Sequence, residues 1–314
     1  MSQNPRPEHF LDLAQWSGEQ LGEVLSLAVR LKSDPRKYAR SLTGKTLAMI
    51  FTKSSTRTRV SFEVGMFQLG GHAIFMSSAA TQVGRGEPLE DTARVLSRYV
   101  DGIMVRTYAH EDVELMARYA SIPVINGLTD LVHPCQVLTD VFTIMEQLGL
   151  VYEELQGLPI AYIGDGNNMA NSWINAARIF GLHLKLACPR GYEPDAGVLA
   201  RFNQDAGAGR VEVLTEASAA AAGARVLNTD VWASMGQEKE AAIRRRVFQG
   251  YQINDELLRI AAPGALVLHC LPAHRGEEIT AAVFERCQDV IFTQAENRLH
   301  VQKALLLTLL GSAD

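Results

Sequence analysis

The chain has 314 residues, of which 47% are hydrophobic and 21% are charged, and its formal net charge is -5. This length suggests two domains with cores of their own, and the composition is that of an ordinary globular protein. A negative net charge argues against a general nucleic-acid-binding protein, although it leaves room for a local basic pocket that holds a small anion.

The start of the chain and its cysteines indicate where the protein works. Residues 1–10 include Pro5, Pro7 and Glu8 and contain no apolar stretch, so they do not resemble a secretory signal peptide. No apolar run is long enough to span a membrane. The four cysteines form no C-x-x-C pair, and their wide spacing fits reduced thiols. We therefore expect a cytoplasmic protein.

Helices and strands are predicted to alternate along most of the chain. Ser17 and Gln20 have the spacing of a capping box, and apolar residues follow at helical spacing as far as Leu31. Strands are predicted at residues 46–51, 73–76, 102–105, 124–126, 158–163, 184–187, 211–214, 226–228, 265–268 and 290–292. Helices are predicted at residues 90–99, 111–120, 136–148, 170–180, 254–261 and 296–310. Such alternation indicates parallel sheets with helices on both faces.

Ten predicted strands are many for one parallel sheet, so the sequence predicts two α/β domains. Each would be a doubly wound parallel sheet, with the active site in the cleft between them. The first domain would span residues 1–149 and the second residues 150–294, because residues 149–157 interrupt one helix before a new strand begins. The last helix, within residues 295–314, would pack back on the first domain.

Polar clusters follow six of the predicted strands, at the edge where doubly wound sheets bind ligands. These clusters are residues 54–59, residue 106, residues 130–136, residues 164–168, residues 230–236 and residues 269–272. Loops selected only for solubility would more often carry Lys, Glu and Gly, whereas these clusters carry Arg, His, Asn, Asp and Cys. They therefore mark candidate binding residues.

The strongest single element is the segment Ser55-Thr56-Arg57-Thr58-Arg59, which opens a predicted helix. A helix N-terminus presents unbonded N–H groups and the positive end of the helix dipole. The hydroxyl groups add donors, and Arg57 has the fork that can hold two phosphate oxygens. Taken alone, the segment fits a phosphate site and an ordinary helix cap beside solvated arginines equally well.

Arg106, His133 and Gln136 are candidates for the rest of such a site. Arg106 ends the third predicted strand and could bind the same phosphate, although an arginine there more often pairs with a neighbouring acid. His133 and Gln136 flank a helix start at Pro134 and could hold a carbonyl oxygen and an amide. Alone, they are more typical of a capping histidine and a surface glutamine.

Residues 164–168 resemble at first the glycine fingerprint of a nicotinamide-dependent dehydrogenase. The third glycine position is occupied by Met169, however, and no acid follows at the end of the next strand. What remains is a tight turn from strand to helix. Asn168 at this turn could recognise a carboxylate or an amine, or could serve the turn alone.

Asp230 and Cys270 follow two later strands. Asp230 could cap the next helix or bind an amine, and it precedes the segment Ser234-Met235-Gly236. A cysteine at the position of Cys270 is most often buried and inert, but its polar, basic loop also fits a working thiol.

Together these segments resemble the aspartate/ornithine carbamoyltransferase family. The matching segments are Phe51-Thr52-Lys53-Ser54-Ser55-Thr56-Arg57-Thr58-Arg59, Met104-Val105-Arg106-Thr107, His133-Pro134-Cys135-Gln136, Asp230-Val231-Trp232-Ala233-Ser234-Met235-Gly236, His269-Cys270-Leu271-Pro272-Ala273 and Ala295-Glu296-Asn297-Arg298. They occur in the family's order over nearly the whole chain. The first three resemble the carbamoyl phosphate motifs of the whole family. The Ser-Met-Gly and His-Cys-Leu-Pro segments resemble its ornithine branch, since the aspartate branch typically has proline where Cys270 stands.

The resemblance implies transfer of a carbamoyl group from carbamoyl phosphate to the side-chain amine of L-ornithine, giving L-citrulline and phosphate in arginine metabolism. It implies neither a metal nor an organic cofactor. The implied carbamoyl phosphate ligands are Ser55, Thr56, Arg57, Thr58, Gln82, Arg106, His133, Gln136, Cys270, Leu271 and Arg298. The implied ornithine ligands are Asn168, Asp230, Ser234 and Met235. The implied catalytic residues are Arg106, His133, Asp230 and Cys270.

The resemblance also implies a homotrimer, or a multiple of trimers, in which the loop carrying Gln82 reaches the neighbouring subunit's carbamoyl phosphate site. From the sequence alone this loop, residues 77–87, is an ordinary surface loop. Three alternatives stay open: a sister carbamoyltransferase acting on putrescine, aspartate or a modified ornithine, a nicotinamide-dependent dehydrogenase, and a non-catalytic amino-acid-binding protein. Neither nucleic acid nor a membrane is expected as a partner.

Overall fold

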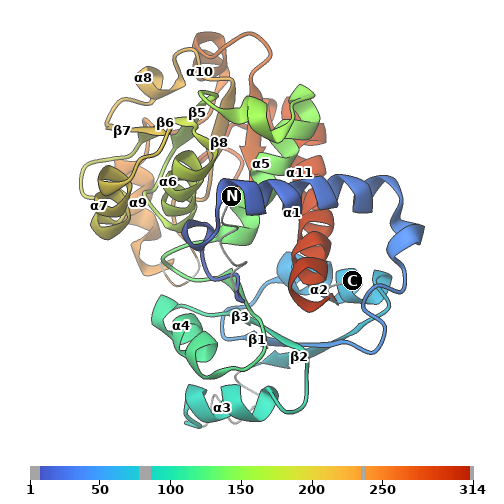
Figure 1. Ribbon diagram of the computed structural model, residues 1–314. Helices are drawn as coiled ribbons and strands as arrows, with labels where there is room; N and C mark the ends of the chain where they lie inside the picture. The colour runs from blue at the N-terminus through green and yellow to red at the C-terminus, as the bar shows by residue number, and fades with distance from the viewer. Residues whose placement is uncertain (1–7, 78–85, 235, 237, 312–314) are drawn as a thin grey trace. The chain divides into compact units, whose positions relative to one another are not determined.

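The computed structural model describes residues 8–77, 86–234, 236 and 238–311 (Figure 1). Contacts between residues divide the chain into two compact units. Residues 1–138 and 297–314 make up the first unit, and residues 139–296 make up the second. The division falls inside two helices, α5 (Pro134–Leu148) and α11 (Ala281–Leu310).

The first unit contains a parallel sheet with the strand order β2-β1-β3-β4. The strands are β1 (Thr46–Phe51), β2 (His72–Ser77), β3 (Gly102–Arg106) and β4 (Val124–Leu128). The helices are α1 (Gly18–Ser33), α2 (Thr56–Gln68), α3 (Leu89–Leu96) and α4 (His110–Tyr119), together with parts of α5 and α11. β2 lies on one side of β1 and β3 on the other, so the chain crosses back over β1 between β2 and β3. The carboxyl ends of β1 and β3 therefore form a switch point, where such sheets bind ligands.

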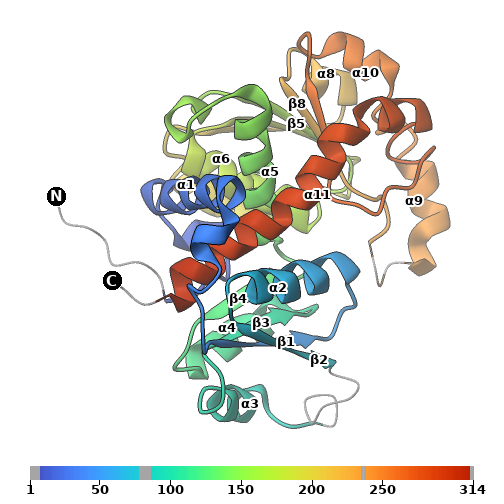
Figure 2. The ribbon, with the colours of Figure 1, turned by 90° about the vertical axis from the view of Figure 1, so that its right-hand side faces the viewer.

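Helices cover both faces of this first sheet, as the predicted architecture requires (Figure 2). Apolar residues of α3 and α4 pack with Ala48 and Ile103 in one core cluster. On the other face, the end of α11 approaches so closely that a side chain at Gly102 would lie 2.7 Å from Leu310. Glycine at the start of β3 thus makes room for α11.

The second unit contains a parallel sheet with the order β7-β6-β5-β8-β9. The strands are β5 (Pro159–Ile163), β6 (His183–Ala187), β7 (Arg210–Leu214), β8 (Val226–Thr229) and β9 (Leu266–His269). The helices are α6 (Asn168–Phe180), α7 (Ala196–Gln204), α8 (Ala217–Ala221), α9 (Ala241–Val247) and α10 (Asp255–Ile260). Its switch point lies between β5 and β8. The predicted fold class, two α/β units built on parallel sheets, is confirmed.

Most predicted elements are present, and one is wrong. The capping box is formed, because the Gln20 backbone donates to Ser17 Oγ at 3.1 Å and the Ser17 backbone donates to Gln20 Oε1 at 2.9 Å. Residues 290–292, predicted as a strand, lie inside α11. Ile291 is buried there while Phe292 is 52% exposed, so the short apolar run packs on one side of a helix. Helices α7 and α9 were not predicted. None of the described helices is long and apolar enough to cross a membrane.

Candidate functional site

Polar side chains gather at the carboxyl ends of the strands in each unit. In the first unit they follow β1, β3 and β4, and in the second they follow β5, β8 and β9. Both groups lie at the switch points of their sheets. Each group is described by itself below.

The N-terminus of α2 follows β1 and has the cap that the sequence predicted. Ser55 adopts an extended backbone, and its Oγ accepts from the backbone N–H of Thr58 at 3.2 Å. Thr56 and Arg57 are exposed in the first turn of the helix, whereas Thr58 is buried. The turn therefore presents hydroxyl groups, an arginine and the positive end of the helix dipole at one place, which suits an anion.

Two buried arginines meet at the hydroxyl of Thr58. Arg106 Nη1 lies 3.4 Å from Thr58 Oγ1, and Arg298 Nη2 donates to the same oxygen at 3.2 Å. Arg298 Nη1 also donates to Gln136 Oε1 at 2.6 Å. The amide oxygen of Gln302, turned toward Arg298, accepts from its Nη2 and Nε at 2.8 and 3.0 Å. Arg298 is thus oriented by a hydroxyl group and two amide oxygens, and its guanidinium and that of Arg106 together suit a ligand with two negative charges.

His133 lies in the electric field of these cations. Burial is the main cause that lowers its pKa well below the usual value, and the charges of Arg298, Arg106, Lys53 and Arg57 lower that pKa further, in this order. The imidazole is therefore neutral at neutral pH and carries one ring N–H as a donor. A neutral donor surrounded by fixed positive charge can stabilise an oxygen that becomes negative.

Lys53 is the residue of this group that our sequence reasoning missed. Its side chain is buried, its Nζ contacts Asp130 Oδ1 at 2.9 Å, and it lies 5.0 Å from the centre of the Tyr108 ring. A lysine two residues beyond a buried strand was the signal that could have found it. Asp130 also belongs to a predicted cluster, and it serves here as the partner of Lys53.

We predict that an anion bound beside these cations raises the pKa of His133. A phosphate dianion would offset the positive charges that repel a proton, and Arg57→Ala would remove one of them. An NMR titration of the His133 ring, with and without phosphate, measures both shifts. Arg36→Ala, an exposed arginine of the same unit, is the matched control and should leave this pKa unchanged. A His133 pKa that is indifferent to phosphate would mean that the anion binds elsewhere.

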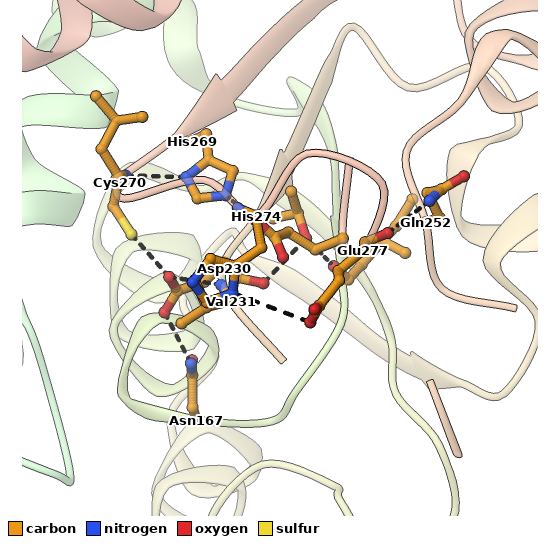
Figure 3. Close-up of polar contacts among 12 residues, drawn as sticks. Asn167, Asp230, Val231, Gln252, His269, Cys270, His274 and Glu277 are labelled. Atoms are coloured by element: carbon orange, nitrogen blue, oxygen red, sulfur yellow. Dashed lines mark hydrogen bonds and ion pairs between the residues drawn. The ribbon is translucent and has the colours of Figure 1, made fainter. Parts of the chain in front are cut away.

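Asp230 is the centre of the polar group in the second unit (Figure 3). It follows β8, is 7% exposed, and accepts from the backbone of Val231 at 2.8 Å. Asn167 Nδ2 donates to its Oδ2 at 2.9 Å, and the Cys270 thiol donates to its Oδ1 at 3.0 Å. These bonds join the ends of β5, β8 and β9 around one carboxylate, which suits recognition of an amine.

The turn after β5 reaches this group through Asn167, which the sequence analysis left out of the candidate ligands. Asn167 caps α6 by accepting from the backbone of Met169 and Ala170. The Tyr162 hydroxyl donates to its Oδ1 at 3.0 Å. Its amide nitrogen donates to Asp230, so Asn167 links the turn after β5 to the carboxylate after β8 in addition to capping the helix. Asn168, the predicted ligand, is buried at the first position of α6.

A buried histidine shapes the backbone at Cys270 and Leu271 (Figure 3). The Leu271 N–H donates to His269 Nδ1 at 2.9 Å, so the proton of the neutral ring is on Nε2, which donates to Glu278 Oε1 at 3.0 Å. Leu271 has a φ of 60°, a conformation that costs a leucine about 1–3 kcal/mol. Strained backbone conformations are common at functional sites, and this one lies directly after Cys270, whose thiol contacts Asp230.

The structure thus brings several of the predicted ligands into contact in the first unit and two of them in the second. In the first unit Arg106 and Arg298 contact Thr58, and Gln136 contacts Arg298; in the second unit Cys270 contacts Asp230. Ser234 is half-buried in the loop after Asp230. Gln82 and Met235 lie outside the described residues.

Comparisons with known proteins match both units. The carbamoyl-P binding domain of aspartate/ornithine carbamoyltransferase matches residues 8–146, and the Asp/Orn binding domain matches residues 156–309. An ornithine carbamoyltransferase from Pelobacter propionicus is 55% identical over 305 residues, covering 96% of this chain and 98% of that one. One from Syntrophus aciditrophicus is 60% identical over 269 residues, covering 86% and 87%.

Solved structures agree with this assignment. The ornithine carbamoyltransferase of Pyrococcus furiosus has a TM-score of 0.90 and 46% identity, with 100% of both chains covered. That of Thermus thermophilus has a TM-score of 0.87 and 43% identity, with 98% of this chain and 100% of that one covered. The chain belongs to the aspartate/ornithine carbamoyltransferase family.

Proposed function

We propose that the chain is an ornithine carbamoyltransferase, which converts carbamoyl phosphate and L-ornithine to L-citrulline and phosphate in arginine metabolism. The observation that carries the proposal is the buried cluster in which Arg106 and Arg298 meet at Thr58 beside the N-terminus of α2. Two guanidinium groups beside a helix N-terminus supply the positive charge that a dianionic substrate requires. The relatives named above, all of the ornithine branch, support ornithine as the acceptor.

In this proposal, residues 1–149 and the part of α11 within residues 295–314 bind carbamoyl phosphate. The phosphate ligands are Ser55, Thr56, Arg57, Thr58 and Arg106. The carbamoyl group is bound by His133, Gln136 and Arg298, with Cys270, Leu271 and Gln82 completing the site. Residues 150–294 bind ornithine through Asn168, Asp230, Ser234 and Met235.

The reaction needs a neutral amine and a stabilised oxyanion. The nitrogen of the ornithine side chain attacks the carbonyl carbon and forms the new C–N bond, while Arg106 and the neutral His133 ring stabilise the negative oxygen. The C–O bond to phosphate then breaks, the carbonyl reforms, and the leaving phosphate takes the proton from the nitrogen. Asp230 and the Cys270 thiol orient the amine. Carbamoyl phosphate is already activated, so the residues account for each step without a cofactor.

A citrulline assay with a panel of acceptors tests the proposal. Purified protein is incubated with carbamoyl phosphate and, in turn, with ornithine, putrescine, aspartate and N-acetylornithine. We expect kcat/KM for ornithine to exceed that for each other amine by at least about a hundredfold, because a site built for a polar group rejects analogues that lack it. Preference for another acceptor would make the chain a sister transferase. Absence of any carbamoylated product would contradict transferase function.

We further propose a homotrimer that works in the cytoplasm. Apolar side chains on the outer side of α2 and on the edge strand β2 are exposed in the single chain, among them Val60, Phe67 at 80%, Ile74 and Phe75. Exposed apolar side chains on a helix and on the strand at the edge of the described sheet fit contact with a second copy. The four free cysteines fit a reducing compartment.

A shared active site predicts that two inactive variants restore each other. Arg57→Ala and Gln82→Ala are unfolded and refolded together, and citrulline formation is compared with each variant refolded alone. In a hybrid trimer, some sites would combine an intact Arg57 from one subunit with an intact Gln82 from the next. Activity of the mixture should therefore exceed that of both variants by at least about tenfold. Hybrids that are verified by mass and gain no activity would contradict the shared site.

A further inference from the structure

Arg244 of α9 is buried against the base of the loop that follows Asp230. Its Nη1 donates to Asp165 Oδ2 at 2.8 Å and to the backbone oxygen of Trp232 at 2.9 Å. Its Nε donates to Glu240 Oε2 at 3.1 Å. Arg244 and Asp165 are each 6% exposed, so the ion pair is held away from water. One guanidinium thus ties the turn after β5 to the loop after β8.

Aromatic rings hold the guanidinium from the side. Its carbon lies 4.9 Å from the centre of the Tyr192 ring and 5.9 Å from that of Phe248. The Trp232 ring stacks on Phe248 at 6.0 Å between centres. Arginine suits such a position because its planar cation stacks on rings while its N–H groups donate in the plane. Lysine would keep the charge but lose this geometry.

The turn that contains Asp165 is held in place by close backbone contacts with residues 192–193. Gly166 donates to the backbone oxygen of Tyr192 at 2.9 Å, and a side chain at Gly166 would lie 2.3 Å from the backbone of Glu193. Asp165 therefore has a fixed position from which to hold Arg244. Trp232, the residue tied by Arg244, lies two positions after Asp230 and two before Ser234. Both of these neighbours are ornithine ligands in the proposed function.

We propose that Arg244 and Asp165 form a positioning pair that holds the start of this loop, residues 231–234, and thereby sets the affinity for ornithine but not for carbamoyl phosphate. The inference rests on the proposed function for its link to ornithine. The tie between Arg244, Asp165 and the loop rests on the contacts alone. Neither residue touches substrate in this assignment.

The pair also makes ornithine affinity sensitive to pH. Burial raises the pKa of Asp165 to about 6 against the opposing charge of Arg244, and the nearby Asp230 and Glu240 raise it further. Tyr162 and Cys188 also lie close to this carboxyl group and remain neutral near pH 6, since burial raises the pKa of each. As pH falls through 6, Asp165 becomes protonated and the ionic part of the tie is lost. The raised pKa also means that Asp165→Asn removes a costly buried charge, so this variant should fold.

Four proteins test the pair: the unchanged chain, Asp165→Asn, Arg244→Lys, and the control Arg246→Ala, an exposed arginine of the same helix. We expect both pair variants to raise the KM for ornithine at least about tenfold. Their Kd for carbamoyl phosphate, measured by calorimetry, should change less than about twofold. The control should match the unchanged chain. Asp165→Asn should keep its Tm. As pH falls below 6, the ornithine KM of the unchanged chain should rise toward that of Asp165→Asn, because Asp165 becomes protonated only in the unchanged chain.

Hydrogen exchange of residues 231–234 supplies a second measurement that does not depend on activity. Exchange should be faster in both pair variants and unchanged in the control. Unchanged exchange or an unchanged ornithine KM would overturn the inference, as would an equal loss of carbamoyl phosphate binding. If the unchanged chain forms no citrulline, the proposed function fails instead, and the exchange rates still decide whether the pair holds the loop.

Discussion

Arg57→Ala is expected to weaken carbamoyl phosphate binding by at least about a hundredfold. Arg57 lies in the first turn of α2, beside the cap made by Ser55, and its charge acts on His133 in the same group. A charge-assisted hydrogen bond to phosphate contributes about 1.5–3 kcal/mol, and a bidentate arginine makes two. Since about 1.4 kcal/mol is a tenfold change in affinity, the loss of both bonds exceeds a hundredfold. Isothermal titration calorimetry with carbamoyl phosphate measures the effect.

Two controls separate loss of a ligand from loss of the fold. Arg36→Ala removes an exposed arginine of the same unit and should bind carbamoyl phosphate normally. Because Arg57 is itself exposed, the Tm of Arg57→Ala should stay within a few degrees of the unchanged protein. Arg57→Ala protein that keeps its affinity would show that Arg106 and Arg298 hold the phosphate without it.

Asp230→Asn is expected to lower kcat/KM for ornithine by about 10²–10³, as removal of a preorganised polar group does in other enzymes. The carboxylate accepts from Asn167, Cys270 and Val231, so all its oxygens face donors. An asparagine would turn an NH2 group toward at least one of them and would no longer attract a substrate amine. Steady-state kinetics with varied ornithine at saturating carbamoyl phosphate measure the loss.

The effect of Asp230→Asn should be confined to the acceptor. Its Kd for carbamoyl phosphate should change far less than its ornithine kinetics, because the ligands proposed for the phosphate group all lie in the first unit. Asp205→Asn is the matched control, since Asp205 is exposed and pairs with Arg178 at 3.1 Å on the surface of the second unit. It should keep full activity. Normal ornithine kinetics in Asp230→Asn would remove this carboxylate from the acceptor site.

Local patterns in the sequence were sufficient for most of the fold. The strands β1 to β9 were predicted because short apolar runs flanked by polar turns depend only on neighbouring residues. The same holds for the capping box of α1, which needs two residues three positions apart. The wrong prediction at residues 290–292 arose because three apolar residues are too few to distinguish the periodicity of a strand from that of a helix. Packing with the rest of the protein places them in α11.

The candidate site was predicted residue by residue as polar clusters at strand ends, and partly through a family resemblance. The contacts that organise it were not predictable, because they join residues far apart in the chain. Arg298 reaches Thr58 across 240 positions, and Asn167 reaches Asp230 across 63. Arg244, which no motif singled out, became visible only through its contacts with Asp165 and Trp232.

The sequence by itself determined which segments form strands and helices, and which of their ends carry polar side chains, since both depend on short-range periodicity. Only the tertiary structure decided which of those side chains meet. The order of the strands brings the ends of β1 and β3 together, and likewise those of β5 and β8. Burial of His133 itself, and then the charges of Arg298 and Arg106 that folding brings near it, lower the pKa of this histidine. Such a shift arises from desolvation and from charges brought close by folding, which no local pattern encodes.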